Sequence, residues 1–265
     1  MSRSITLGHY LPGTSLIHRL NPRVKILALI IILILLFNLN TYSGLTGFFF
    51  LAMALIASTK VPFRYFVRGI RPIIYIIVFA LVIYLFFTKG GVVLFRIGFV
   101  TVESEGVREG FFVIIRLISL VLFSLMVTLT TTPLSLTYGI SYFLKPFRYI
   151  GLPTEEVAMI MAVALRFIPT LMEESQRLMR AQVARGADFG SGSIFRKAKS
   201  LIPLIVPLFV SAFRRADELA LAMEARGYRL GAKRTRMYED LIAPIDWAVL
   251  AIVLALLSIT LAFNL

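Results

Sequence analysis

The residue types that most often carry out enzyme chemistry are scarce in this chain. It has no cysteine, and its two histidines both lie in the first 18 residues, so thiolate chemistry is excluded and a histidine-based metal centre is poorly supplied. The acid pairs Glu155/Glu156 and Glu173/Glu174 are poor acid–base dyads, because adjacent residues of a helix point in different directions. The phosphate-binding glycine loop, the nucleophile elbow and the zinc-binding His-Glu-x-x-His motif are all absent. The sequence therefore predicts a non-catalytic protein that needs no metal or cofactor of its own.

One motif occurs twice and is the best candidate for a binding function. Ala-x-x-Ala-Arg-Gly is found at 181–186 and at 222–227, each time after an amphipathic stretch of similar length. Glycine stops a helix by adopting the left-handed conformation, and an arginine at a helix C-terminus presents a planar fork of donors suited to a carboxylate. The alternative, that Ala-Arg-Gly is only a good helix end, is also open, although the repetition weakens it. Two such ends suit a partner with two equivalent acidic grooves, and the predicted contact residues are Ala184, Arg185, Gly186, Ala225, Arg226 and Gly227.

Two long helices are expected to position this motif. The first begins after Gly151-Leu152-Pro153 with Thr154 as its cap, and Pro169 kinks or restarts it. The second begins near Pro203 or Pro207. The first helix has an apolar face, and the second has a face lined by small side chains, which lets another helix approach closely. These partner-facing residues are Leu171, Met172, Leu178, Met179, Ala212, Ala216 and Ala220.

The composition indicates an all-α integral membrane protein. Apolar residues make up 58% of the chain and charged residues only 16%, whereas soluble domains have about 45–50% and about 25%. Two apolar runs, Val157–Ile168 and Leu201–Phe213, are short and more often belong to an interface or a protein core than to a span. Five runs are predicted to span the bilayer, at about 24–39, 44–58, 72–87, 111–131 and 246–262.

The positions of lysine and arginine predict how the chain is oriented. Basic residues precede the first span and fill the link between the second and third, but none lies between the first and second, which places the N-terminus in the cytoplasm. The chain then divides into an N-terminal membrane region, 1–132, a cytoplasmic domain of amphipathic helices, 133–245, and a C-terminal span, 246–265. Arg116 lies one to two turns into the fourth span, and we interpret it as a side chain that reaches the outer interface rather than as a functional charge.

With these motifs the chain resembles the transmembrane T component, EcfT, of energy-coupling factor (ECF) transporters, a class of ABC importers. The resemblance rests on the two Ala-Arg-Gly ends in their contexts, ALRFIPTLMEESQRLMRAQVARGADF and ADELALAMEARGY. The segment GHYLPGTSLIHRLNPRVK, from Gly8 to Lys25, is similar to the group II subgroup, whose T component is shared among several substrate-binding S components. The resemblance covers nearly the whole chain.

This resemblance implies a scaffold in the prokaryotic cell membrane that couples two cytoplasmic ABC ATPases to one or several interchangeable S components for vitamins or other micronutrients. Arg185 and Arg226 would each enter a groove in one ATPase, and ATP-driven closure would move both helices and reorient the S component. The apolar helix faces and the region Ser135–Tyr149 would hold the S component. ATP and Mg²⁺ would be bound by the partner ATPases, and nucleic acid is not an expected partner.

Two other classes of function are compatible with the composition. A membrane enzyme acting on an anionic lipid would use the basic residues to hold headgroups, but no catalytic constellation can be assembled for it. A self-contained channel or transporter would need paired intramembrane charges or inverted repeats, and Arg116 alone is thin support. Solute flux through the purified chain in liposomes would favour the channel.

Overall fold

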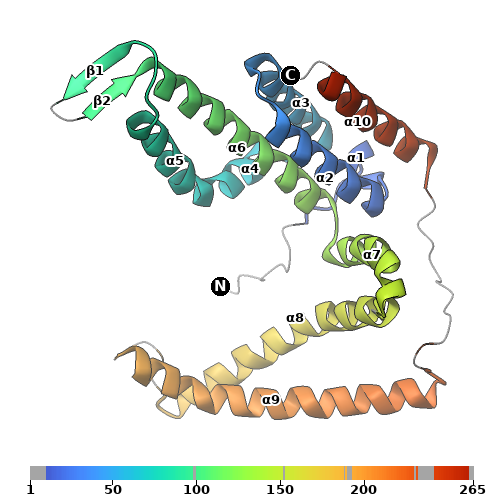
Figure 1. Ribbon diagram of the computed structural model, residues 1–265. Coiled ribbons are helices and arrows are strands. Elements are labelled where there is room, and N and C mark those ends of the chain that lie inside the picture. Colours follow the sequence, from blue (N-terminus) through green and yellow to red (C-terminus); the bar gives the residue numbers. More distant parts are fainter. Residues whose placement is uncertain are drawn as a thin grey trace. The chain divides into compact units, whose positions relative to one another are not determined.

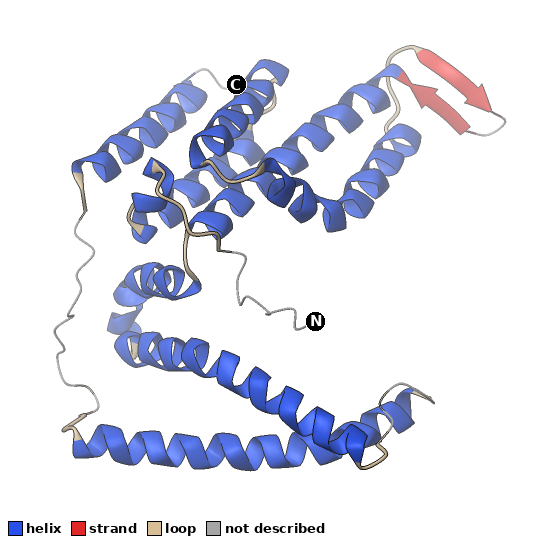
Figure 2. Ribbon diagram, turned by 180° about the vertical axis from the view of Figure 1, so that it is seen from behind, coloured by secondary structure: helices blue, strands red, loops and turns tan. Residues whose placement is uncertain are grey.

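The computed structural model describes residues 10–97, 100–151, 153–187, 189, 193–229, 231 and 242–262. This part of the chain is almost entirely helical, with one two-stranded antiparallel hairpin (Figures 1 and 2), which confirms the all-α class. It forms two compact units, unit 1 from Met1–Tyr142 with Tyr238–Leu265 and unit 2 from Phe143–Met237. The elements in chain order are α1 (Leu16–Arg19), α2 (Pro22–Asn38), α3 (Tyr42–Thr59), α4 (Phe63–Ile70), η1 (Arg71–Ile73), α5 (Ile74–Phe87), β1 (Val93–Ile97), β2 (Val100–Glu103), α6 (Ser104–Thr130), α7 (Pro133–Leu144), η2 (Lys145–Ile150), α8 (Thr154–Ala184), α9 (Ile194–Ala225) and α10 (Pro244–Ala262).

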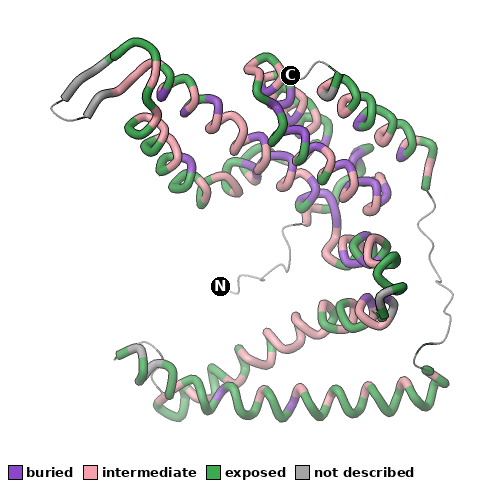
Figure 3. The backbone as a smooth tube through the Cα atoms, viewed as in Figure 1, coloured by how far each residue is buried: buried purple, intermediate pink, exposed green. Residues whose placement is uncertain are grey.

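The core of unit 1 lies between α2, α3, α6 and α10. Each of these helices is apolar, and the side chains that face its neighbours are buried (Figure 3). The largest of them are fully enclosed, whereas apolar side chains on the outer faces remain exposed: Tyr75 on α5 is 81% exposed and Phe87 is 79% exposed. An apolar surface of this extent has to be covered by lipid or by a partner. The buried core includes Leu35 and Leu36 of α2, Leu45 of α3, Leu122, Phe123 and Leu129 of α6, and Val253 of α10.

Three helical stretches in the described residues are long and apolar enough to cross a membrane. They are Tyr42–Thr59, Phe63–Phe87 and Ser104–Thr130, and Pro244–Thr260 is a shorter apolar helix. Helix α2 has 17 residues, so it is about 25 Å long and close to the thickness of the hydrocarbon layer. These helices make the chain an integral membrane protein, while the number of five spans and the three predicted domains stay predictions.

The link between α5 and α6 contains a β-hairpin that the sequence patterns did not indicate. Val93–Ile97 and Val100–Glu103 pair as antiparallel strands, and α6 begins at Ser104, about two turns before the predicted span. Glycines allow α6 to lie close to α5, because a Cβ on Gly106 would meet the carbonyl oxygen of Tyr84 at 2.8 Å. Charged residues in this link had obscured the start of α6.

Arg116 forms a contact with α2 that the sequence patterns did not indicate. Its guanidinium donates a hydrogen bond to the carbonyl of Leu39, the residue that ends α2, and lies 4.7 Å from the centroid of the Phe112 ring. A cation at the C-terminus of a helix is favoured by the helix dipole. Arg116 therefore joins the end of α2 to the middle of α6, and its reach to the outer interface stays a prediction.

Unit 2 is built on two long helices, α8 and α9. Pro169 lies inside α8, which continues without a restart for 31 residues, and α9 begins at Ile194 rather than near Pro203 or Pro207. Proline removes only one backbone donor and one hydrogen bond, and packing between α8 and α9 keeps both helices continuous. The residue before α8 is Pro153, so the prediction that Thr154 caps the helix is wrong.

Candidate functional site

The two Ala-Arg-Gly segments have the same backbone geometry. Helix α8 ends at Ala184 and α9 ends at Ala225. The glycines that follow have positive φ angles, 86° at Gly186 and 77° at Gly227. In each case the N–H of the residue after the glycine donates back to a carbonyl in the last helical turn: Ala187 to Gln182 at 2.9 Å, and Tyr228 to Met223 at 3.0 Å. Both are Schellman ends, so the sequence repeat is a structural repeat.

The six residues of the two motifs are exposed in the structure. Among the described residues, neither Arg185 nor Arg226 forms an ion pair with a carboxylate. Each arginine directly follows the last residue of a long helix, at the negative end of its dipole, and its exposed guanidinium can bind an external acceptor. The structure thus presents both arginines at accessible helix ends, as predicted, and their binding partners stay predictions.

The two ends lie far apart on unit 2. Helices α8 and α9 run in opposite directions, so their C-termini are at opposite ends of the helix pair (Figure 1). Helix α9 has 32 residues and is therefore about 48 Å long. One small groove could therefore not accept both arginines at once.

A cavity between α8 and α9 brings together part of the predicted partner-facing set. Its volume is about 520 Å³, and it is lined mainly by apolar side chains. Leu171 of α8 and the alanine stripe of α9 line this cavity, whereas Met172, Leu178 and Met179 do not. Met179 is 44% exposed on the outside of α8. The stripe residues at the cavity are Ala212, Ala216 and Ala220.

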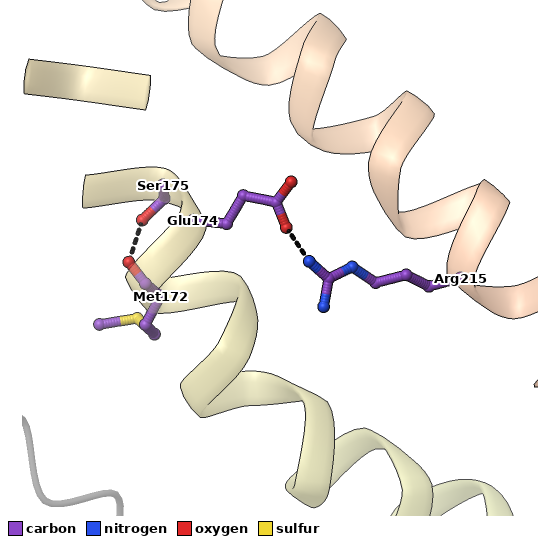
Figure 4. Close-up of polar contacts among 4 residues, drawn as sticks. All are labelled: Met172, Glu174, Ser175 and Arg215. Atoms are coloured by element: carbon purple, nitrogen blue, oxygen red, sulfur yellow. Dashed lines mark hydrogen bonds and ion pairs between the residues drawn. The ribbon is translucent and has the colours of Figure 1, made fainter. Parts of the chain in front are cut away.

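One ion pair ties α8 to α9 and was missed in the sequence. The Nη2 atom of Arg215 donates to Oε2 of Glu174 at 2.7 Å (Figure 4). Both side chains are partly shielded, with 33% and 24% of their surfaces exposed. Glu174 belongs to one of the acid pairs dismissed as a catalytic dyad, and its partner lies 41 residues away, beyond the reach of helical spacing rules.

The glycines of the two motifs are expected to be needed for their positive φ and not for space. A Cβ on Gly186 or Gly227 would contact nothing within 4 Å, so Gly186→Ala and Gly227→Ala each strain only the backbone, at a cost of about 1–2 kcal/mol. We expect faster hydrogen exchange at the amides of Ala187 and Tyr228, measured by mass spectrometry. Gly47→Ala, in open space on α3, is the control and should leave exchange unchanged. If these amides exchanged no faster in Gly186→Ala and Gly227→Ala than in the control, the Schellman geometry would be contradicted.

A buried polar cluster in unit 1, here called the Lys25 junction, joins α2, α6 and α10. Lys25 is only 5% exposed, and its Nζ donates to the carbonyl of Thr130 at 3.0 Å and to Oγ1 of Thr131 at 3.1 Å. Asp246 is 2% exposed and accepts the backbone N–H groups of Asn21 and Ala243, both at 2.8 Å. The junction thereby fixes the C-terminus of α6 to the N-termini of α2 and α10.

Stability of unit 1 is expected to depend on the protonation of His18, next to this junction. Its Nε2 donates to the carbonyl of Leu11 at 3.1 Å, and Nδ1 lies 2.7 Å from Oγ of Ser15. Burial lowers the pKa of His18 below its ordinary 6.5, partly offset by the Leu11 hydrogen bond, and Lys25 lowers it further. Because the folded pKa is below the unfolded one, the stability from neutral His18 is present above pH 6.5 and is lost as the pH falls through the folded value.

Thermal unfolding in detergent at pH values from about 8 to about 5 measures this dependence. His18→Gln should flatten the fall in Tm below pH 6.5, whereas the control His9→Gln should not. An unaltered pH profile in His18→Gln would show that another group is responsible.

The comparisons with known proteins decide the family. The family CbiQ, described as cobalt transport protein, matches residues 13–238. The chain belongs to this family. A relative from Thermosediminibacter oceani is 48% identical over 93% of this chain and 92% of its own length. One from Acidaminococcus fermentans is 48% identical over 99% and 97%, and one from Bacillus subtilis is 44% identical over 91% of each. All three are named energy-coupling factor transporter transmembrane protein EcfT.

The CbiQ/EcfT match covers both Ala-Arg-Gly ends and most of unit 1. It confirms the resemblance to the transmembrane component of ECF transporters, and it identifies the chain as a transport protein of that kind. The assignment to the shared group II subgroup stays a prediction.

Proposed function

We propose that this chain is the coupling subunit of an ECF-type importer, carrying motion from two ATPase subunits to an S component. The supporting observation is the pair of identical, exposed helix ends at Ala184–Gly186 and Ala225–Gly227. In this proposal Arg185 docks in one ATPase and Arg226 in the other. The position of the two ends at opposite ends of the α8–α9 pair suits two subunits, each binding one end (Figure 1).

The long helices suit the transmission of motion. Helix α8 is continuous through Pro169, and α9 is continuous through Pro203 and Pro207. Each helix can therefore move as a rigid body. The Glu174–Arg215 ion pair links α8 to α9. A displacement applied at either arginine end is then expected to move the whole helix pair, because little of it is absorbed by bending.

We further propose that the S component packs against α8 and α9 and delivers a vitamin or another micronutrient. The apolar cavity lined by Leu171 and the alanine stripe supports this contact, since small side chains allow a helix to approach closely. Met172, Leu178 and Met179 would extend the contact outside the cavity. The N-terminal segment from Gly8 to Lys25 supports the shared subgroup, in which several S components exchange on one T component.

The proposal places the N-terminus and unit 2 in the cytoplasm of a prokaryotic cell. The basic residues around α4 support this orientation by the positive-inside rule. ATP and Mg²⁺ would be bound only by the partner ATPases, and this chain would contribute no catalytic group, bind no cofactor and contact no nucleic acid.

Affinity purification of the tagged chain from native membranes in mild detergent, followed by mass spectrometry, tests this function. Two ATP-binding subunits and one or several small hydrophobic proteins are expected to co-purify. Several different hydrophobic proteins would identify the shared subgroup, and a single one a dedicated system. Recovery of the chain alone, together with solute flux through it in liposomes, would overturn the proposal in favour of a self-contained transporter.

A further inference from the structure

The first acidic residue of the chain is Glu103, so the first 102 residues contain lysine and arginine but no side-chain carboxylate. Four of them lie between the spans α3 and α5, at Lys60, Arg64, Arg68 and Arg71, and all four are exposed. None of the four forms an ion pair with a carboxylate in the part of the chain that the structure describes. This surface is complementary to an anionic partner that does not belong to the chain.

Helix α4 and its C-cap residue Arg71, which keeps helical backbone angles, align three of these cations. Arg64, Arg68 and Arg71 occupy positions i, i+4 and i+7, which share one helical face, and they form what is here called the arginine row. The opposite side of α4 is fixed, because Phe66 is fully buried. A Cβ on Gly69 would meet the Leu125 side chain of α6 at 2.6 Å. Close packing on α6 therefore sets the direction in which the row points.

An aromatic ring supports two arginines of the row. The guanidinium carbon of Arg64 lies 5.1 Å from the centroid of Tyr65, and that of Arg68 lies 6.0 Å from it. A guanidinium that uses its face on an aromatic ring keeps the N–H groups along its edge, and these suit the oxygens of a phosphate. A phosphate, which offers several acceptor oxygens, therefore matches the donor edges of these guanidiniums.

The position of α4 indicates that the phosphate belongs to a membrane lipid. Helix α4 follows α3 and runs on through η1 into α5 (Figure 1), and the stretch Phe63–Phe87 is long and apolar enough to cross a membrane. The cost of charge in hydrocarbon keeps the arginines at the start of this stretch at headgroup level. Phe63 and Val67, which are 51% and 50% exposed, lie next to the row and can enter the boundary between headgroups and acyl chains. A lipid satisfies both the cations and the apolar side chains at once.

We propose that the arginine row of α4 is a binding site for the phosphate headgroups of anionic phospholipids. The row binds phosphatidylglycerol-type lipids in preference to zwitterionic ones, with Lys60 adding positive charge beside it. Juxtamembrane cations of this kind attract anionic headgroups and lose the attraction in high salt. The site lies on unit 1 and is separate from the helix ends of the coupling proposal.

The test measures lipid preference in the purified full chain. Nanodiscs containing phosphatidylcholine and phosphatidylglycerol are extracted with detergent, and the lipids that stay bound are quantified by mass spectrometry. Wild type should retain phosphatidylglycerol preferentially. Arg64→Gln/Arg68→Gln/Arg71→Gln should lose that preference by about tenfold or more. Arg64→Lys/Arg68→Lys/Arg71→Lys, which keeps the charge, should lose less of that preference. A thermal unfolding curve shared with wild type shows that all variants are folded.

A matched control removes three exposed arginines from α8 and α9 and leaves the row intact. Arg177→Gln/Arg180→Gln/Arg214→Gln should retain phosphatidylglycerol as wild type does. The proposal would be overturned if the row variant retained as much phosphatidylglycerol as wild type, or if the control lost as much as the row variant. Unchanged lipid retention with loss of a co-purifying protein would assign the row to an acidic protein surface and would also overturn it.

Discussion

Replacement of both Arg185 and Arg226 by alanine is expected to abolish uptake while leaving the chain folded in the membrane. Both side chains are exposed at helix ends, so their removal costs the isolated chain little stability. In the assembled transporter each would be withdrawn into a groove and bonded to a carboxylate. Removing one partner of such a buried charge pair costs about 2–5 kcal/mol, which is roughly a thirtyfold to a few thousandfold loss of affinity.

Uptake of a labelled substrate by cells and binding of the ATPase subunits to the purified chain measure this effect. Each single variant should bind the ATPases more weakly, and the double variant should bind neither. Arg177→Ala/Arg214→Ala is the matched control, because it removes the same charge from exposed positions of α8 and α9 and should transport normally. Normal uptake by Arg185→Ala/Arg226→Ala would sink the coupling role of these residues.

Loss of either charge from the Lys25 junction is expected to destabilise unit 1 strongly. Lys25→Met leaves Asp246 buried without a nearby cation, and Asp246→Asn places an amide donor against one of the N–H groups of Asn21 or Ala243. Breaking a buried charged arrangement by removing one member costs about 3–5 kcal/mol. The transition temperature in detergent should fall in both single variants.

The double variant Lys25→Met/Asp246→Asn separates electrostatic coupling from loss of packing. Because the two residues belong to one buried cluster, the double variant should be less destabilised than the sum of the singles. Lys60→Met, which removes an exposed cation, is the control and should change the transition temperature little. Strictly additive effects would indicate that Lys25 and Asp246 act independently, and small effects would show that the junction does not hold the helices together.

Local features of the fold and site followed from the sequence, and features that depend on long-range contact did not. The positive φ of Gly186 and Gly227 was predictable, because a repeated Ala-Arg-Gly at the end of an amphipathic stretch specifies the helix end locally. The continuation of α8 through Pro169 was not, because the loss of one hydrogen bond is outweighed by packing against α9. Helix propensity alone does not indicate whether the lost hydrogen bond or the packing against α9 has the larger effect.

Charged residues at membrane edges had an ambiguous meaning in the sequence. Lys25 was counted as a topology signal and Asp246 only as the start of a span, yet they belong to one buried junction although 221 residues separate them. The sequence did contain an indication of this junction, because Lys25 follows the first apolar residue of a span and Asp246 is the only acid after Asp240. Arg116 was likewise visible as an intramembrane charge, but its acceptor at Leu39 lies 77 residues away.

Site-specific cross-linking tests the central claim most directly. The chain has no cysteine, so Ala181→Cys and Ala222→Cys place single reactive thiols one turn before each Ala-Arg-Gly end, both at exposed positions. Asn40→Cys, in the link between α2 and α3, serves as the control. With a short photoactivatable cross-linker in native membranes, both helix ends should capture an ATP-binding subunit and Asn40→Cys should capture none. Capture of only membrane-embedded proteins or lipid at both helix ends would contradict the account.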